Sequence, residues 1–98
     1  MNIQAMMKQA QKLQKEMTET KSKIDSMEFI GKSSAVSVTV NGKKEVKKIQ
    51  IDGTHFDEDD IEMLEDMVMI AVNDAMKQVD REIEEKMGKY TQGMPGLF

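Results

Sequence analysis

The chain has no cysteine and no tryptophan, and it has one histidine and one proline among its 98 residues. Without cysteine it has no disulfide framework, no thiolate metal ligand and no cysteine nucleophile, and a cytoplasmic protein is the expectation. The single histidine, His55, lies in a predicted turn and belongs to no spacing that is typical of a catalytic or metal site. We therefore expect no enzyme activity, no metal and no cofactor.

Long apolar segments are also missing. No run approaches the ~20 apolar residues that cross a bilayer, and residues 1–12 lack the apolar core of a signal peptide. The sequence therefore predicts a soluble protein with no membrane partner. A chain this short makes one domain, over residues 1–98, with a modest core, so we expect a partner subunit to supplement its stability.

Charge is present in quantity and is unevenly distributed. Residues 1–28 have a net charge of +1, residues 29–53 of +3 and residues 54–98 of −8, which leaves −4 for the whole chain. The folded protein could therefore present separate basic and acidic surfaces. Eleven methionines supply flexible apolar bulk, which favours an interaction protein over a rigid catalyst.

The first segment has a heptad pattern, in which apolar residues recur at alternating steps of three and four. This seam consists of Ile3, Met6, Ala10, Leu13, Met17, Thr20, Ile24 and Met27. Because no glycine or proline interrupts it, the pattern predicts a helix over about residues 3–27, about 37 Å long. A stripe this narrow favours packing on another helix instead of on a sheet.

The following segment, within about residues 29–52, has the period of β-strands. Val36, Val38 and Val40 alternate with polar residues, and Asn41 and Gly42 then predict a turn. A second strand is expected over about residues 45–51, and a short strand over about 29–32 could add a third. Val46 is out of phase with Ile49, which predicts either a bulge near Lys47 or a strand with two partly covered faces.

A second long helix is expected over about residues 57–87. Asp57 is a suitable N-cap, Gly88 is expected to end the helix, and an irregular tail is expected over 88–98. Every residue from Met67 to Val72 is apolar, which requires cover on more than one side of the helix. The later stripe of Val79, Ile83 and Met87 is expected to pack on the N-terminal helix. Together these elements predict an α+β fold with a small antiparallel sheet of two to three strands.

Acidic residues at the start of this helix allow two interpretations. The run from Asp57 to Asp60 could hold a cation, but helix capping explains it fully. Asn73 and Asp74 follow the apolar stretch, and we expect them to fix pairing register or subunit contacts instead of performing chemistry.

Two groups of basic residues are candidates for nucleic-acid binding. On the first helix, opposite the heptad seam, lies a stripe of Gln4, Lys8, Gln11, Lys12 and Lys15. Lysines there could neutralise phosphates and glutamines could bond to phosphate or base edges, although a solvated helix face is the simpler interpretation. The second group is Lys43, Lys44, Lys47 and Lys48 in the hairpin, where solubility and edge protection are alternatives to DNA binding.

Three segments carry a resemblance to a known family. They are IEMLEDMVMIAVNDAMKQ (residues 61–78), the VTVNG turn with the Lys-rich strand that ends at Ile51 and Asp52, and the tail with its MG and GMPG motifs. In this combination and order the chain resembles the YbaB/EbfC family of bacterial nucleoid-associated proteins. The resemblance implies a tweezer-like homodimer whose helical arms grip duplex DNA with little sequence specificity, which affects nucleoid organisation or gene expression. It also implies a location at the nucleoid.

The acidity of the chain keeps an alternative open. An acidic helical adaptor could instead bind a protein partner through its Met-rich surfaces and through Met94, Leu97 and Phe98 of the tail. If DNA is the partner, the Glu-rich end of the second helix would repel phosphate unless it faces away. We therefore expect a modest and strongly salt-dependent DNA affinity.

Overall fold

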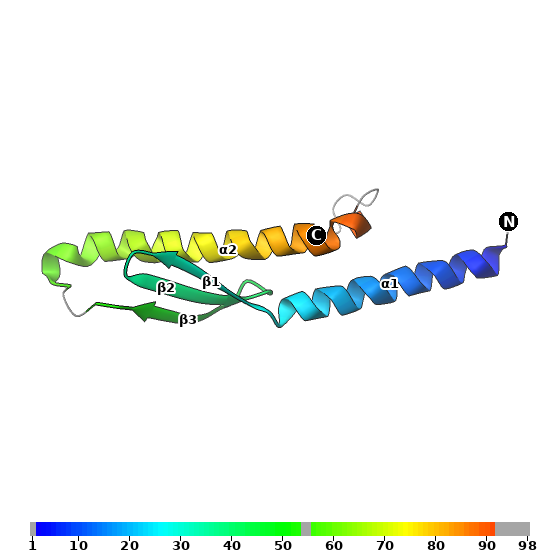
Figure 1. The fold of residues 1–98 in the computed structure, drawn as a ribbon, viewed down its shortest axis with the longest axis horizontal. Helices are drawn as coiled ribbons and strands as arrows, with labels where there is room; N and C mark the ends of the chain where they lie inside the picture. Colours follow the sequence, from blue (N-terminus) through cyan, green and yellow to red (C-terminus); the bar gives the residue numbers. More distant parts are fainter. Residues whose placement is uncertain (1, 54–55, 92–98) are drawn as a thin grey trace.

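The computed structural model describes residues 2–53 and 56–91, so the expectations for His55 and for residues 92–98 lie outside the described residues. The elements, shown in Figure 1, are α1 (Ile3–Asp25), β1 (Glu28–Ser33), β2 (Val36–Asn41), β3 (Val46–Ile51), the 3-10 turn η1 (Glu58–Asp60) and α2 (Ile61–Thr91). This order confirms the predicted α+β fold, with three strands between two long helices.

The three strands form one antiparallel sheet in the order β1-β2-β3. The register between β2 and β3 shifts by one residue, because Thr39 pairs with Lys48 while the next residue, Val40, pairs with Val46. Lys47 is therefore the extra residue of a β-bulge, which is one of the two alternatives that the sequence predicts.

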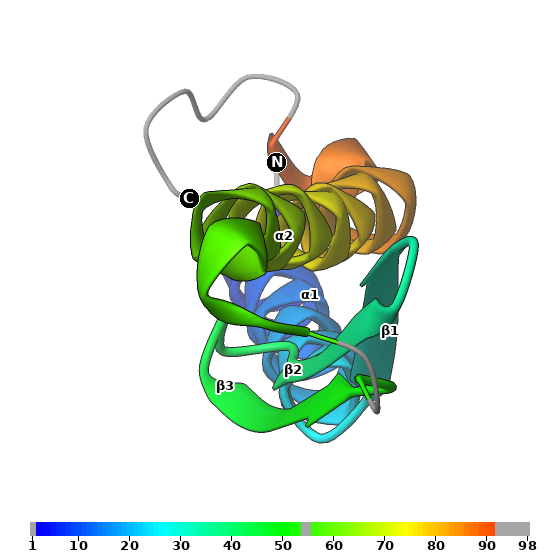
Figure 2. The ribbon, with the colours of Figure 1, turned by 90° about the vertical axis from the view of Figure 1, so that its left-hand side faces the viewer.

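The core lies between one face of the sheet and α2. On β2, Val36, Val38 and Val40 are fully buried, whereas Ser37 and Thr39 alternate with them on the other face. The valines pack in one cluster with residues of α2 that include Ala71 and Ala75. In the end-on view α2 lies on one side of the sheet, where it packs on β1 and β2 (Figure 2). The opposite side of the sheet carries mostly polar residues, together with Ile30, which is half exposed.

Gly31 brings α2 unusually close to β1. A Cβ atom added at Gly31 would lie 2.1 Å from the carbonyl oxygen of Ala71 and 2.5 Å from the backbone nitrogen of Ala75. Such distances leave no room for a side chain, so glycine on the strand and alanines on the helix together set the distance between the two layers.

The outer edge of β1 is bonded to side chains of α2. The Lys32 backbone N–H donates to the Asp74 carboxylate at 3.1 Å, and the Gln78 side-chain amide donates to the Ile30 carbonyl at 2.7 Å. Asp74 therefore fixes a strand edge within its own chain. Asn73, its neighbour, is exposed.

The start of α2 follows prediction and its end does not. The Asp57 carboxylate accepts from the Asp59 N–H at 3.0 Å and the Asp60 carboxylate accepts from the Asp57 N–H at 3.1 Å, so these acids form a capping box. The helix continues through Gly88 to Thr91 instead of ending at Gly88. Glycine ends a helix by adopting a left-handed conformation, and Gly88 does not have a positive φ. Met87, the residue before Gly88, is buried.

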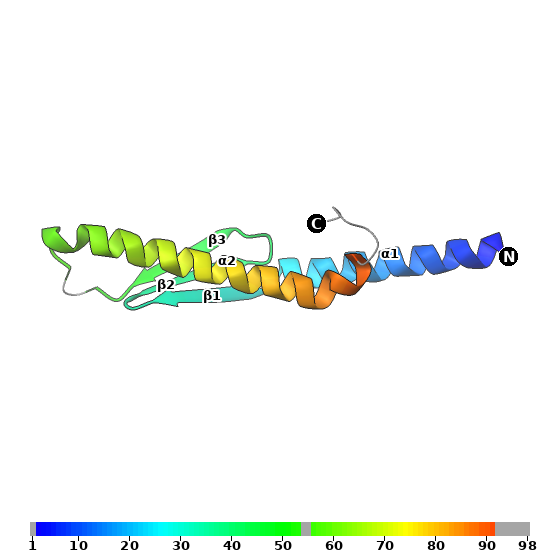
Figure 3. The ribbon, with the colours of Figure 1, turned by 90° about the horizontal axis from the view of Figure 1, so that it is seen from above.

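Helix α1 projects beyond the sheet as an arm, as Figures 1 and 3 show, and the chain extends over 71 Å. The Asn2 side chain caps its N-terminus. Its other end is fixed against the hairpin between β2 and β3: Ile24 is buried, and a Cβ atom at Gly42 would lie 1.8 Å from the Ile24 carbonyl oxygen. The same hairpin is joined to α2 by a 2.5 Å ion pair between Lys44 and Asp80.

Helix packing within one chain is less extensive than the sequence predicts. Helix α1 contacts α2, but its residues before Glu16 are exposed. Val79 of α2 was expected to pack on α1, but its side chain lies in the core between α2 and the sheet, because the sheet covers that side of the helix. In the middle of α2, Met69 and Ile70 are more than half exposed, so the predicted cover on a second side is not supplied by this chain.

Candidate nucleic-acid interface

The predicted DNA-binding residues all lie on the projecting arm. The structure places Gln4, Lys8, Gln11, Lys12 and Lys15 on α1, and all five are exposed. Steps of four, three and four residues put Gln4, Lys8, Gln11 and Lys15 on one face of the helix, with Lys12 next to them. This arm face is about 16 Å long, at 1.5 Å per residue. It provides positive charge and amide groups in a row, without cover from the rest of the described chain.

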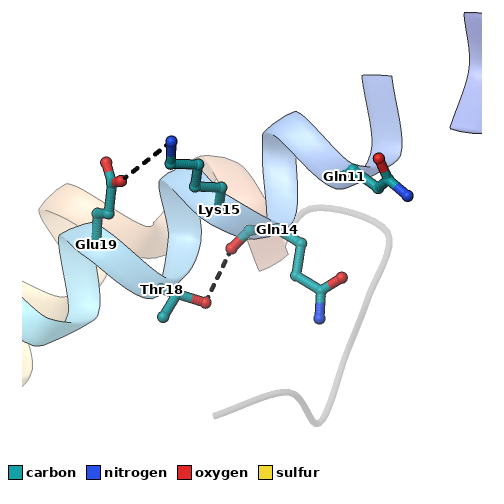
Figure 4. Close-up of a pocket in the computed structure, with 5 residues that line it drawn as sticks. All are labelled: Gln11, Gln14, Lys15, Thr18 and Glu19. Atoms are coloured by element: carbon teal, nitrogen blue, oxygen red, sulfur yellow. Dashed lines mark hydrogen bonds and ion pairs between the residues drawn. The ribbon is translucent and has the colours of Figure 1, made fainter. Parts of the chain in front are cut away.

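The lysines of the arm face are not equivalent. Figure 4 shows Lys15 and Glu19 turned toward one another on a shallow surface pocket, with 4.0 Å between the ammonium nitrogen and a carboxylate oxygen. Gln11, Gln14 and Thr18 also line this pocket, and the Thr18 hydroxyl donates to the Gln14 backbone carbonyl at 2.9 Å. Among the described residues, Lys8 and Lys12 make no ion pair within 4.0 Å. Their charges are therefore the more available for phosphate.

The opposite side of the arm is apolar and largely uncovered. Along the seam, Ile3 is 70% exposed, Met6 54% and Leu13 46%. Only toward the C-terminal end do Met17, Thr20 and Ile24 become partly or fully buried. The arm thus has a polar face suited to phosphate and an apolar face that the described residues cover only toward its C-terminal end.

Charge is separated between the two layers of the fold. Residues 3–51, which form the arm and the sheet, carry ten lysines and five carboxylates, whereas α2 carries four basic residues and eight carboxylates. In Figure 1 the arm and sheet lie along one side and α2 along the other. The acidic charge that opposes DNA binding is therefore concentrated in the helix layer, and basic charge dominates the other.

The hairpin lysines do not act as one group. Lys44 is paired with Asp80, which offsets its charge. The Glu45 carboxylate accepts from the Asn41 side-chain amide at 2.7 Å, and this hydrogen bond, followed by the nearby Lys47, lowers the pKa of Glu45. That carboxylate therefore stays ionised beside Lys47 and offsets part of the hairpin's charge.

Lys48 belongs to a surface that the sequence interpretation did not identify. This outer face of the sheet, turned away from α2, includes Lys32, Ser37, Thr39, Lys47, Lys48 and Gln50, as the strand register shows. Lys32 was not among the candidates. Buried and exposed residues alternate along β1, with Phe29 and Gly31 buried and Lys32 exposed. Recognition of this strand period in the sequence could have placed Lys32 on the exposed face.

Such an arrangement of exposed lysines and amides is suited to binding phosphate. In the part of the chain that the structure describes, no three histidine or acidic residues are grouped to hold a metal ion. Nor is any helix in that part long and apolar enough to cross a bilayer. A small α+β domain with a projecting basic arm has the architecture of a protein that binds a phosphate-bearing partner.

Sequence comparison identifies the family within that class. The chain matches the YbaB/EbfC DNA-binding family over residues 1–94, and it belongs to that family. It is 43% identical to a nucleoid-associated protein of Enterococcus faecalis, over 98% of this chain and 94% of the relative. It is 52% identical to a nucleoid-associated protein of Clostridium botulinum, over 97% of this chain and 86% of the relative.

Comparison of structures agrees with this assignment. An uncharacterized protein from Helicobacter pylori, known from a crystal structure, superposes with a TM-score of 0.75 at 25% sequence identity. The superposition covers 92% of this chain and 97% of the other. The projecting arm and the sheet with its single long helix are therefore part of a fold that has been observed in a crystal.

Proposed function

We propose that this protein is a nucleoid-associated DNA-binding protein of the bacterial cytoplasm, which grips duplex DNA as a homodimer through the arm face of α1. Lys8 and Lys12 neutralise backbone phosphates, with a smaller contribution from Lys15, and Gln4 and Gln11 hydrogen-bond to phosphate or base edges. Contacts of this kind give affinity with little sequence specificity. Through them the protein affects nucleoid organisation or gene expression.

The observation that carries the proposal is the exposed arm face on a helix that projects from the domain. A lysine stripe on a solvated helix has no necessary function, but a helix that extends beyond its own core has little stability to gain from doing so. Membership of a DNA-binding family supplies the partner for which such an arm is suited.

The dimer is supported by apolar surface that one chain leaves exposed. On β3, Val46, Ile49 and Ile51 pair with the buried valines of β2 and so share their side of the sheet, yet each is about half exposed because α2 packs on β1 and β2. Met69 and Ile70 of α2 are also exposed. Monomeric soluble proteins rarely expose this much large apolar surface.

The dimer proposal predicts that a charge on the apolar side of β3 separates the subunits. Replacing Ile49 with aspartate should weaken association at least tenfold, because it removes ~2 kcal/mol of apolar burial and adds a charge to the interface. Sedimentation equilibrium measures the association constant. Gln50→Asp is the control, since it adds the same charge to the opposite face of the same strand; equal effects of the two substitutions would contradict this use of the surface.

Binding of the purified protein to duplex DNA tests the function itself. The proposal predicts a dissociation constant that rises steeply between about 50 and 200 mM salt, with a slope that reflects the number of phosphates contacted. Competitor duplexes of different, unrelated sequences should each reduce binding by almost the same amount. Absence of duplex binding at low salt, together with retention of a specific protein partner after nuclease treatment, would favour the acidic adaptor instead.

A further inference from the structure

Lysines from two different strands meet on the outer face of the sheet. Lys32 of β1 pairs with Ser37 of β2, and Lys48 of β3 pairs with Thr39 of β2. Directly paired residues of antiparallel strands lie on the same face. Since Ser37 and Thr39 alternate with valines that are buried under α2, the two lysines lie on the side away from the core.

The bulge adds a third lysine to this face. Val46 pairs with Val40 and so lies on the α2 side of the sheet, which turns the following residue, Lys47, to the outer face. Lys48 lies there as well, because it pairs with Thr39. In a strand without the extra residue, one of two consecutive lysines would point to the α2 side.

The positive charge of this face is available over most of its length. Within the described chain, Lys32, Lys47 and Lys48 make no ion pair within 4.0 Å. Glu28 and Glu45 lie at one end of the sheet, where Glu28 pairs with Asn41 and Glu45 accepts a hydrogen bond from it. At the β1 edge the Asp74 carboxylate accepts from the Lys32 backbone N–H and leaves the Lys32 ammonium without an ion pair among the described residues. The rest of the face combines lysines with the hydroxyls of Ser37 and Thr39 and with one apolar side chain, Ile30.

We propose that the outer face of the sheet is a second binding surface for duplex DNA, at which Lys32, Lys47 and Lys48 contact backbone phosphates. The inference rests on the proposed function, because it assigns further contacts to the same partner. Lys32 and Lys48 lie two strands apart, about 10 Å across the sheet at about 4.8 Å per strand. That separation suits different phosphates of a backbone instead of one small anion.

The composition of the face also selects among nucleic acids. Single-stranded binding surfaces stack bases on exposed aromatic rings. The one aromatic residue of the sheet, Phe29, is buried on the α2 side. Hydroxyl and amide groups beside the lysines are suited to phosphate oxygens, which a duplex presents without unstacking its bases.

The test compares the salt dependence of duplex binding for Lys32→Ala/Lys48→Ala and for wild-type protein. Each lost phosphate contact lowers the slope of the logarithm of the binding constant against the logarithm of salt concentration by about 0.9, so we expect a decrease of about 1.8 for each subunit that touches DNA. Lys32→Arg/Lys48→Arg, which keeps both charges, should retain the wild-type slope. Lys86→Ala/Lys89→Ala is the control of equal charge, placed on α2, where Lys86 lies 3.8 Å from Glu85 and the Lys89 ammonium lies over Tyr90.

The outcomes separate this surface from the arm. If wild-type protein binds duplex DNA and Lys8→Ala/Lys12→Ala weakens that binding, but Lys32→Ala/Lys48→Ala keeps the wild-type slope, the second surface is refuted and the arm is not. An equally large decrease of the salt slope in Lys86→Ala/Lys89→Ala would also refute the second surface, because the effect would then follow net charge alone. Absence of duplex binding by the wild-type protein overturns both proposals.

Discussion

Replacing Lys8 and Lys12 with alanine is expected to reduce duplex affinity on the order of 100-fold at 0.1 M salt and to lower the salt slope by about 3.6 for two subunits. These two side chains are exposed and make no ion pair among the described residues, so the substitutions remove positive charge without breaking a contact of the fold. Fluorescence anisotropy with a labelled duplex, repeated at several salt concentrations, measures both quantities.

Comparison with Lys15→Ala makes this prediction specific. Because the Lys15 ammonium lies 4.0 Å from the Glu19 carboxylate, its loss should cost clearly less affinity than the loss of Lys8 or Lys12 alone. Adding Lys15→Ala to the double variant should therefore change the slope little. If the three single substitutions have equal effects, or if Lys86→Ala/Lys89→Ala weakens binding as much as the double variant, the arm face is not the contact surface.

The second large effect is expected from Gly31→Ala, which should lower the free energy of unfolding by about 3 kcal/mol or more. A new Cβ atom would lie 2.1 Å from a backbone oxygen of α2 and 2.5 Å from a backbone nitrogen, so the whole helix must move away from the sheet. Overpacking of a core commonly costs about 1–3 kcal/mol even where side chains can adjust, and backbone atoms adjust less. Urea denaturation at a fixed protein concentration measures the change.

Gly88→Ala is the matched control for Gly31→Ala. The same methyl group is added, but at Gly88 it meets no atom within 4 Å and the residue is helical. Alanine is favoured over glycine in a helix by up to about 1 kcal/mol, so this substitution should stabilise the protein. A loss of stability below about 0.5 kcal/mol for Gly31→Ala would show that α2 does not rest on β1 as closely as the structure has it.

Local patterns in the sequence were sufficient to predict most elements of the fold. The alternation of Val36, Val38 and Val40 predicted β2, and Asn41 and Gly42 predicted the turn. The broken phase at Val46 predicted either a bulge or a strand with two partly covered faces, and the register shows the bulge. Each of these features is determined by residues that are close together in the sequence. The predicted end of α2 was wrong, because a glycine near a helix end can either end the helix in a left-handed conformation or remain helical, and Gly88 remains helical.

Of the candidate site, the sequence suggested only the residues that lie on a single helix, α1. The arm face follows from helical spacing alone, since its five members lie within twelve residues of α1. The ion pair of Lys15 with Glu19 is also local and could have been foreseen from the step of four. By contrast, Lys32 and Lys48 are sixteen residues apart, and only the strand register shows that they share a face. Likewise, the ion pair between Lys44 and Asp80 joins residues from distant parts of the sequence.

The bonds from Asp74 and Gln78 to β1 limit how the sheet can grow. They occupy the backbone groups of Lys32 and Ile30 that another strand would need, so the sheet is closed at that edge. Its other edge, β3, has no neighbouring strand within the described chain. When the open β3 edges of two copies pair, the joined sheet ends on both sides in a β1 edge that is already occupied. Any edge-to-edge pairing between copies therefore stops at two chains, whereas a sheet open on both sides could continue into a fibre.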